Sequence, residues 1–399
     1  MRGQRLMQGP PPLLLFAAVG CVLLFLIVSF EWYYHGEGSS VELHFPSRET
    51  SGTYSTGGPK STRFEETINN ATLGFGKILV VNLPERTDHR DALTLISGLT
   101  NIHLDWIDGI WGKDIPDKAL PLGANRELMG NGNLGSWRAH MNAIQAVVSQ
   151  NLSSALILED DVDWDVRLKS QLLDFARGSR ALVQPLKGSN TFADPTFQSR
   201  DSDSNIKALD HELDDKSAAT QPPSISPYGD NWDVLWLGHC GVRFPAPSQN
   251  IPKGRYLILN DDTVPGSDHI VSLSEEFRTK YVNKTRIVHH AMGPICTFGY
   301  AVTQAGAREI LYELSVKEMR GAFDNIMANF CDRHTCLTSQ PQLFSHHRPP
   351  GPVSKDSDIN DGATGVREKG YTENVQWSAR MNVEGLLKGE TVFEDQFLS

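Results

Sequence analysis

One short segment constrains the fold and the site of this chain more than any other. Residues 155–162 read Ala-Leu-Ile-Leu-Glu-Asp-Asp-Val, an apolar run that ends abruptly in Glu159, Asp160 and Asp161. Such a run predicts a buried strand that carries carboxylates at its carboxyl end. Open α/β sheets bind ligands just beyond the carboxyl ends of their strands, and carboxylate oxygens suit Mg2+ or Mn2+ there. The segment therefore predicts a divalent-metal site that holds a diphosphate.

The alternative interpretation of these residues is structural. An acidic turn can simply be solvated at the surface, and it also favours the amino end of a following helix. Two other acidic pairs, Asp261–Asp262 and Asp356 with Asp358, lie in polar turns and follow no long apolar run. We expect both of these pairs at the surface.

The first thirty residues predict a membrane anchor. Leu13 to Phe30 are eighteen consecutive uncharged residues, and at about 1.5 Å per residue this run is ~27 Å long, enough for a thin bilayer. Arg2 and Arg5 precede the run and Glu31 follows it, so the positive-inside rule places residues 1–12 in the cytosol. A cleaved signal peptide is the alternative, but the run exceeds the usual length and no clear Ala-x-Ala site follows it.

This topology places the rest of the chain in a secretory lumen, and a short span favours the Golgi membrane. Residues 31–72 are rich in Gly, Ser and Thr without an apolar period, which predicts a flexible stem. Sequons at Asn70, Asn151 and Asn283 would be glycosylation acceptors on the lumenal side. We therefore expect a single-pass type II glycoprotein.

The cysteines divide between the two parts of the chain. Cys21 lies in the apolar run, whereas Cys240, Cys296, Cys331 and Cys336 lie in the lumenal part, where disulfides are allowed in three pairings. Cys331 and Cys336 could instead hold zinc around His334. A second ligand pair at a usual spacing is missing, so a local disulfide is favoured.

The charge balance excludes one class of partner. The chain carries a formal net charge of -11, whereas a nucleic-acid-binding protein needs a basic face to contact the phosphate backbone. We therefore expect no nucleic-acid partner. With 39% hydrophobic residues, the chain can bury a full core, and we expect one lumenal catalytic domain over residues 73–350.

Two segments are expected to differ from this domain core. Residues 188–230 are dense in Ser, Asp, Gln and Pro and have no apolar period, which predicts a disordered insertion. Residues 351–399 are expected to form a C-terminal extension.

Apolar runs and helical patterns alternate along the domain. Lys77 to Leu83 is the first buried strand, and a polar turn and a helical pattern that ends near Leu99 follow it. Strand, turn and helix begin an α/β unit. Further elements are expected as strands at Leu104–Ile107, Trp232–Leu237 and Tyr256–Leu259, a loop at Asp108–Gly132, and a helix at Asn133–Gln150. The expected fold class is α/β, a mixed sheet flanked by helices, preceded by one transmembrane helix.

Three sequence blocks occur in a specific order. They are Ile78-Leu-Val-Val-Asn-Leu-Pro-Glu-Arg86 with Arg90, Gly135-Ser-Trp-Arg-Ala-His140, and Leu156-Ile-Leu-Glu-Asp-Asp-Val162. In this order they resemble glycosyltransferase family 25, which groups lipopolysaccharide-type sugar transferases with collagen galactosyltransferases. The chain is most similar to the fungal members, and the similarity spans about Lys77 to Pro350.

The second block departs from the family pattern. Many relatives carry Gly-Cys-x-x-Ser-His there, whereas this chain has Ser136 and Ala139 in place of the Cys and the Ser, so only Gly135 and His140 carry over. The resemblance implies a GT-A-like, Rossmann-type fold and a nucleotide-sugar donor, usually UDP-linked. It also implies an inverting transfer of a galactose-like hexose to a glycan or glycoprotein acceptor.

The acidic strand end would then hold the cation. Asp161, with Glu159 or Asp160, would bind Mn2+ or Mg2+, which bridges the diphosphate and stabilises the charge on the departing nucleotide. His346, in His346-His-Arg-Pro-Pro350, would add a late metal ligand, as a C-terminal His often does in GT-A-like enzymes.

Contacts to the donor are expected from six residues. These are Asn82, Arg86, Arg90, His140, Glu159 and Asp160. Arginine pairs with phosphate through two parallel hydrogen bonds, which suits Arg86 and Arg90. The alternatives are that these two arginines, four residues apart, merely cover a helix face, and that His140 is a helix histidine with satisfied hydrogen bonds.

An inverting transfer to a hydroxyl needs a carboxylate that removes the acceptor proton. Asp324, in Gly321-Ala-Phe-Asp-Asn325, lies where the family has a recurring acidic residue. Its alternative role is to cap a helix that begins near Asn325.

Two other functions compete with a transferase. A non-catalytic lumenal glycan-binding or assembly subunit would keep the fold without turnover, and the altered second block allows it. A metal-dependent phosphohydrolase would need more His and Asp ligands than the sequence offers for a two-metal site.

Overall fold

The structure is a computed structural model that describes residues 63–199, 209–212, 219–281, 283–359 and 364–397. All of them belong to one compact unit, Lys60–Ser399. The predicted cytosolic segment and the predicted anchor, residues 1–12 and 13–30, lie outside the described residues. Within the described ranges, no helix combines the length and the apolar character needed to span a bilayer.

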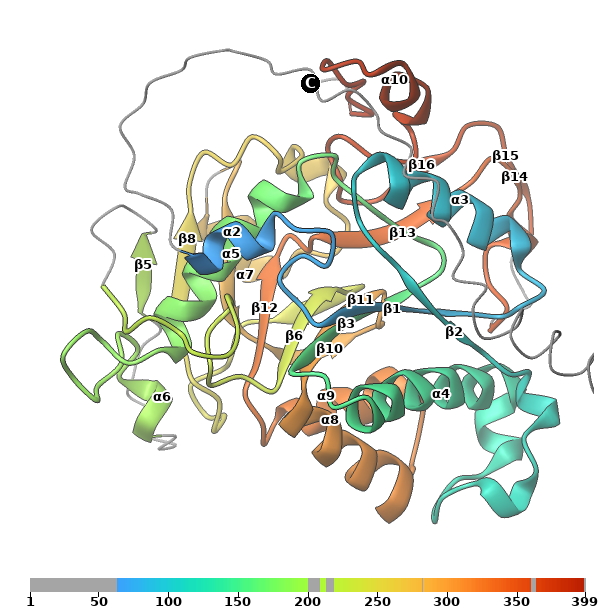
Figure 1. Ribbon diagram of the computed structural model, residues 1–399, viewed down its shortest axis with the longest axis horizontal. Helices are drawn as coiled ribbons and strands as arrows, with labels where there is room; N and C mark the ends of the chain where they lie inside the picture. Colours follow the sequence, from blue (N-terminus) through green and yellow to red (C-terminus); the bar gives the residue numbers. More distant parts are fainter. Residues whose placement is uncertain (1–62, 200–208, 213–218, 282, 360–363, 398–399) are drawn as a thin grey trace, which may run out of the picture. The chain divides into compact units, whose positions relative to one another are not determined.

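A nine-stranded mixed sheet forms the centre of the unit (Figure 1). Its strands are, in spatial order, β2 (Asp105–Asp108), β1 (Lys77–Asn82), β3 (Ser154–Glu159), β11 (Gly299–Thr303), β6 (Val234–Gly238), β12 (Cys336–Gln340), β9 (Arg286–His290), β8 (Arg255–Ile258) and β5 (Asp210–Glu212). Only β11 and β9 run against the others. The carboxyl ends of the parallel strands therefore meet at one edge of the sheet.

Both faces of the sheet are buried. Ile78 and Val80 of β1 pack in one hydrophobic cluster, and the alternate residues Leu79 and Val81 pack in another. Because successive side chains of a strand point to opposite faces, each face needs its own helical cover. This is the α/β layering that the apolar runs predicted, and the large mixed sheet flanked by helices is confirmed.

The helices divide between the two faces (Figure 1). Those that share a cluster with Ile78 are α2 (Arg63–Ile68), α3 (Thr87–Leu99) and α5 (Leu168–Val183). Those that share a cluster with Leu79 are α4 (Arg126–Ser149), α8 (Gln304–Leu311) and α9 (Phe323–Cys331). A π-helical turn, Tyr312–Lys317, continues α8. The short helices α6 (Thr196–Ser199) and α10 (Val383–Lys388) also reach the first cluster, through the partly buried side chains of Phe197 and Val383, whereas α7 (Glu275–Lys280) packs Phe277 in a third cluster.

Helix α4 begins earlier than the sequence predicted. The long loop expected over 108–132 contains two 3-10 turns, Gly112–Asp114 and Asp117–Ala119, and the start of α4. Asn125 caps α4 because its side chain accepts a hydrogen bond of 3.0 Å from the Leu128 N–H. The helix breaks at Gly130, which has a φ of 73°, and the predicted helix over 133–150 is its second part.

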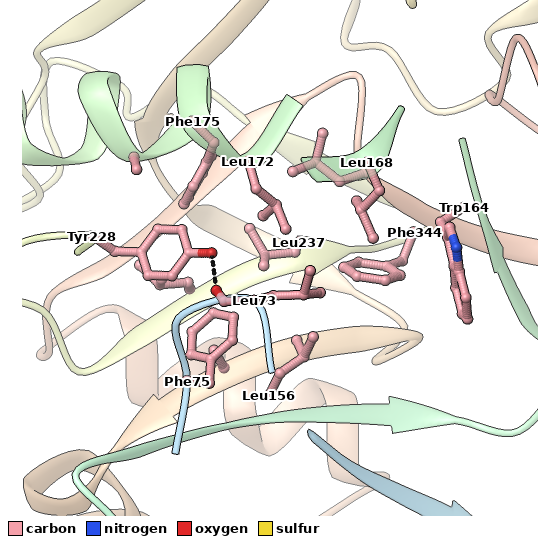
Figure 2. Close-up of a cluster of buried hydrophobic side chains, with 14 of the residues drawn as sticks. Leu73, Phe75, Leu156, Trp164, Leu168, Leu172, Phe175, Tyr228, Leu237 and Phe344 are labelled. Atoms are coloured by element: carbon pink, nitrogen blue, oxygen red, sulfur yellow. Dashed lines mark hydrogen bonds between the residues drawn. The ribbon is translucent and has the colours of Figure 1, made fainter. Parts of the chain in front are cut away.

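Aromatic side chains fill the core under α5 (Figure 2). The rings of Phe75 and Tyr228 stack with centroids 4.8 Å apart, and Phe175 packs beside Tyr228. The Tyr228 hydroxyl donates a hydrogen bond of 2.6 Å to the Leu73 carbonyl, so the one polar atom of this buried ring is satisfied.

Several described residues within 188–230, the predicted insertion, are packed against the sheet. Tyr228 is fully buried, and Asp194 is 1% exposed. The Asp194 carboxylate accepts hydrogen bonds from Thr196 and from the Gly254 N–H. Residues 200–208 and 213–218 lie outside the described ranges.

A second, smaller sheet joins the C-terminal part to the domain. Its strands are, in order, β16 (Tyr371–Thr372), β13 (Phe344–Arg348) and β4 (Val162–Trp164). β4 directly follows the acidic turn after β3, so residues beyond 350 pack next to that turn. The remaining short strands are β7 (Gly241–Arg243) with β10 (Met292–Ile295), and β14 (Gly351–Pro352) with β15 (Val366–Arg367).

The expected surface position of the other acidic pairs was wrong for two residues. The Asp261 side chain is 10% exposed and pairs with Arg286 at 2.7 Å. The Asp356 side chain is also 10% exposed and pairs with Arg367 at 2.8 Å, whereas Asp358 is one-third exposed and pairs with Arg86. The polar sequence context did not indicate these ion pairs, because the partners lie 25, 11 and 272 residues away along the chain, outside any local pattern.

Candidate metal centre and donor site

Polar side chains gather where the parallel strands end. Asn82 ends β1 and Glu159 ends its neighbour β3, and Asp160 and Asp161 form the turn before β4. His346 lies on β13 opposite Val162 of β4. The pairing of β13 with β4 therefore brings an imidazole from late in the chain onto the acidic turn.

Glu159, Asp161 and His346 form a three-residue cluster. One ligand atom from each lies within 4.8 Å of the others. His346 Nε2 is 3.5 Å from Asp161 Oδ2 and 3.6 Å from Glu159 Oε2. The structure thus brings together the three residues that the sequence named as metal ligands.

The cluster has free ligand atoms and excess negative charge. Asp161 Oδ1 and His346 Nε2 are buried and have no hydrogen-bond partner among the residues that the structure describes. Burial raises the pKa of Asp161, and the charges of Glu159 and Asp160 add to the rise although His346 opposes it. Two carboxylates and an imidazole with unsatisfied atoms fit a divalent cation.

The proton on His346 lies where a cation would bind. Arg348 Nη2 is 3.0 Å from His346 Nδ1, and because arginine only donates, Nδ1 accepts and Nε2 carries the proton. Burial would lower the pKa of His346, but Asp161 and Glu159 outweigh it and the pKa is raised. A metal ligand needs an unprotonated Nε2, so a cation would replace this proton.

Two buried side chains contact the Glu159 carboxylate at the same oxygen, Oε1. The Thr297 hydroxyl donates a hydrogen bond of 2.8 Å to Glu159 Oε1, and His140 Nε2 lies 3.4 Å from the same oxygen. Burial would raise the pKa of Glu159, but the contacts with His140 and His346 outweigh it and lower the pKa. Glu159 is therefore an anion fixed in orientation.

His140 lies beneath the cluster rather than at its surface. It is 1% exposed, its ring stacks on Phe323 with centroids 4.4 Å apart, and Nδ1 is 3.1 Å from the Tyr300 hydroxyl. This helix histidine is packed on every side, and it reaches the predicted donor site through Glu159.

Asp160 turns away from the cluster. Its Oδ2 accepts a hydrogen bond of 2.7 Å from Asn82 Nδ2, and its Oδ1 is 3.0 Å from His89 Nδ1. The structure therefore pairs Glu159, and not Asp160, with Asp161 as candidate ligands. Asn82 Oδ1 is buried without a partner in the described part of the chain and is free to accept from a ligand.

Arg86 and Arg90 have different surroundings. Arg86 contacts Asp358 and His89 and pairs with Asp88 at 3.0 Å. Because His89 also contacts Asp160, the Arg86 guanidinium lies near the acidic turn. Arg90 instead pairs with Asp108 at 3.0 Å. The two predicted donor contacts thus point to different places.

Asp324 contacts the residue that precedes Thr297. Its Oδ2 accepts a hydrogen bond of 3.1 Å from the Cys296 N–H, and it contacts no ligand of the cluster directly. α9 begins at Phe323 after Ala322, and no side chain caps it. Ala322 therefore occupies the N-cap position, but Asp324 Oδ1 accepts a hydrogen bond of 2.7 Å from the Asn325 N–H, so Asp324 also satisfies an amide in the first turn of α9.

Sequence reasoning missed three residues of this site. His89 lies between Arg86 and Arg90, in the first turn of α3, and nothing in the sequence there indicated its contact with Asp160. Thr297 lies just before β11, in a segment that carries no motif. Arg380 lies in the predicted extension, and its guanidinium donates to the carbonyls of Val162 and Asp160 at 3.0 and 3.1 Å.

Cys240, Cys296, Cys331 and Cys336 form two disulfides. Cys331 pairs with Cys336, which confirms the favoured local bond, and Cys240 pairs with Cys296. The second bond lies next to Thr297 and therefore borders the candidate site.

Comparison with known proteins agrees with the resemblance seen in the sequence. Residues 75–218 match the family model described as Glycosyltransferase family 25 (LPS biosynthesis protein). Procollagen galactosyltransferases 1-B and 1-A of Xenopus laevis are 19% and 18% identical over 212 and 214 residues. Each match covers 50% of this chain and 27% of the relative, so the chain spans about a quarter of the length of these curated relatives.

Fold and site define an α/β protein with a candidate divalent-metal centre at the carboxyl edge of its sheet. The family match and the two relatives support membership of this chain in glycosyltransferase family 25. The matched segment contains Asn82, Arg86, His140 and the acidic turn, and it ends before Asp324 and His346.

Proposed function

We propose that this protein is a glycosyltransferase with a GT-A-like fold that moves a galactose-like hexose from a nucleotide-sugar donor to a glycan or glycoprotein hydroxyl. The Glu159–Asp161–His346 cluster carries the proposal, because its ligand atoms converge within 4.8 Å at the sheet edge where α/β proteins bind ligands. Family membership and the two procollagen galactosyltransferase relatives support the same activity.

The cluster would hold Mn2+ or Mg2+. When bound, such an ion supplies positive charge to the diphosphate as the nucleotide leaves. Asp161 offers an oxygen without a hydrogen-bond partner in the described ranges, and Thr297 and His140 fix the orientation of Glu159. The chain would thus provide two carboxylates, of Glu159 and Asp161, and the His346 Nε2 atom, which would lose its proton when the cation binds.

Donor recognition is assigned to the ends of β1 and β3. Arg86 is placed to pair with phosphate through its planar guanidinium. Asn82 Oδ1 is buried and unpartnered among the described residues, so it can accept from the nucleotide. Arg90 is the more distant contact, because Asp108 holds it near β2.

Asp324 is assigned as the general base. The acceptor oxygen attacks the anomeric carbon of the donor sugar while the bond from that carbon to the diphosphate oxygen breaks, and the bonding pair leaves with the nucleoside diphosphate. The acceptor proton passes to the Asp324 carboxylate. Attack opposite the leaving group inverts the anomeric configuration.

The proposal includes the secretory compartment. Two disulfides suit an oxidising lumen, and the three predicted glycosylation sites, Asn70, Asn151 and Asn283, are all exposed. With the apolar run at 13–30 as a type II anchor, the domain would face the Golgi lumen.

The test uses the full chain with a panel of UDP- and GDP-sugars, with Mn2+ or with chelator, and measures donor hydrolysis and transfer. We expect turnover of one donor that requires Mn2+ and falls at least about 100-fold in Asp161→Asn, because a bound cation contributes several kcal/mol to such a step. Asp262→Asn is the matched control, since it removes the same charge from an exposed carboxylate.

Absence of donor binding and turnover in the wild-type chain would refute the enzyme assignment. That result would favour the non-catalytic glycan-binding or assembly subunit, which would keep partner binding in Asp161→Asn.

A further inference from the structure

A three-residue loop, Cys296–Phe298, contacts the proposed site at every position. The Cys296 N–H donates to Asp324 Oδ2 at 3.1 Å. The Thr297 hydroxyl donates to Glu159 Oε1 at 2.8 Å. The Phe298 ring lies against the His346 ring with centroids 3.6 Å apart. The loop therefore joins the proposed base to two proposed metal ligands.

The loop also holds the backbone of the acidic strand. The Glu159 N–H donates to the Phe298 carbonyl at 3.0 Å. Glu159 is thus bound to the loop through both its main chain and its side chain. Because Thr297 and His140 both approach Oε1, the other oxygen, Oε2, is the one that faces His346. The hydroxyl of Thr297 therefore selects which carboxylate oxygen enters the cluster.

Three contacts fix the conformation of the loop. Cys296 is disulfide-bonded to Cys240, which follows β6. Trp236 Nε1 donates to the Cys296 carbonyl at 2.9 Å, and the Cys240 N–H donates to the Ile295 carbonyl at 2.8 Å. Cys296 has a φ of 61°, a conformation that is unfavourable for a non-glycine residue and persists only where the surroundings enforce it.

We propose that Thr297 is a positioning residue for the metal ligand Glu159, and that the Cys240–Cys296 disulfide locks the Cys296–Phe298 loop so that Thr297 can act. This inference rests on the proposed metal-dependent function and adds to it. Hydrogen bonds to metal ligands orient them, and their loss commonly weakens metal affinity by about 10- to 100-fold. A freed Glu159 carboxylate would rotate and present no fixed oxygen to the cation.

The chain offers a matched comparison for each part of the proposal. Thr263 donates its hydroxyl to the Asp261 carboxylate, the same kind of bond as that of Thr297 but outside the cluster. The Cys331–Cys336 disulfide joins α9 to the start of β12, whereas the acidic cluster lies where β3 ends.

The first experiment measures Mn2+ binding to the full chain by the loss of the free-ion electron paramagnetic resonance signal. We expect Thr297→Val to raise the Kd for Mn2+ by at least about 10-fold. Thr297→Ser, which keeps the hydroxyl, should stay within about threefold of wild type, as should Thr263→Val. Rescue by serine is an effect that loss of packing alone would not produce.

The second experiment removes each disulfide in turn. Replacing both Cys240 and Cys296 by Ser should raise the Kd for Mn2+ about as much as Thr297→Val, whereas the Cys331 and Cys336 double substitution should leave it unchanged. Melting temperatures of both double variants are recorded, so that loss of stability is separated from loss of the site.

The possible failures are distinguishable. A wild-type chain that binds no Mn2+ overturns the proposed metal-dependent function, and this inference with it. Wild-type binding that is equally tight in Thr297→Val overturns the role of Thr297 alone. Equal effects of the two disulfide removals overturn the specific locking role of Cys240–Cys296.

Discussion

At the scale of single residues, the most informative contact is that of Arg86 with Asp358. The guanidinium that we assign to the donor phosphate is paired with a carboxylate from residues 353–359, and the Lys355 carbonyl accepts from it at 3.3 Å. Asp358 therefore occupies the anion-binding position of Arg86. A phosphate must displace this carboxylate or share the guanidinium with it.

Removal of the Asp358 charge should tighten donor binding. We expect Asp358→Asn to lower the Kd for UDP in the presence of Mn2+ by up to about fivefold, because the Asp358 side chain is one-third exposed and such pairs contribute at most about 1 kcal/mol. Calorimetric titration measures this change. Asp356→Asn is the control, since it removes the same charge but pairs with Arg367. Weaker UDP binding in Asp358→Asn would instead mean that Asp358 orients Arg86.

At the scale of elements, the central strands carry buried histidines. His239 follows β6, and its Nε2 donates to the Ser339 carbonyl of β12 at 3.0 Å. His289 of β9 accepts from Gln340 at 2.9 Å and donates to the His290 carbonyl at 2.7 Å. Burial lowers the pKa of His239 from 6.5 to about 4 and lowers that of His289 well below its usual value. These strands therefore require neutral imidazoles.

This requirement predicts acid destabilisation. The unfolded chain binds a proton at His239 as the pH falls below 6.5, and the folded chain does so only near 4. The stability that neutral His239 provides is complete above pH 6.5 and is lost as the pH falls to about 4, at about 1.4 kcal/mol per pH unit, or about 3 kcal/mol in all.

The measurement is chemical denaturation of wild type and His239→Gln at pH 7 and at about pH 4. We expect the substitution to reduce the acid-induced loss of unfolding free energy by about 3 kcal/mol, whatever its effect at pH 7. His289 remains in the variant and keeps its own share of the loss. An identical loss in both proteins would contradict the prediction.

At the scale of the whole molecule, residues close to the C-terminus complete a site in the middle of the chain. Arg380 holds the carbonyls of Asp160 and Val162. Asp163 accepts hydrogen bonds from Thr372 at 2.6 Å and from the Arg380 N–H at 3.2 Å. We therefore expect the shape of the acidic turn to depend on the packing of the C-terminal segment, residues 371–397, against it.

Arg380→Lys tests this dependence. A lysine keeps the charge but lacks the planar fork that reaches two carbonyls. We expect the Kd for Mn2+ to rise about 10-fold, with a lower melting temperature because a buried carbonyl loses its donor. Arg320→Lys is the control, because Arg320 is exposed and pairs with Glu318. Unchanged Mn2+ affinity in Arg380→Lys would show that the acidic turn keeps its shape without the Arg380 guanidinium.

Much of the fold followed from local sequence. The apolar runs placed β1, β3 and β6 to within a few residues, because a strand buried on both faces must be continuously apolar. The acidic residues at the end of β3 indicated the site, since a buried strand can present charge only where it emerges. The short spacing of Cys331 and Cys336 likewise favoured the bond that the structure contains.

The residues that complete the site were decided by tertiary structure alone. Thr297, Arg380 and Asp358 meet Glu159, Asp160 and Arg86 across 138, 220 and 272 residues of chain. Sequence patterns report the local period of a strand or helix and the chemistry of single residues. Contacts over such separations depend instead on how strands are ordered in the sheet and where the C-terminal segment packs, and no local pattern encodes either.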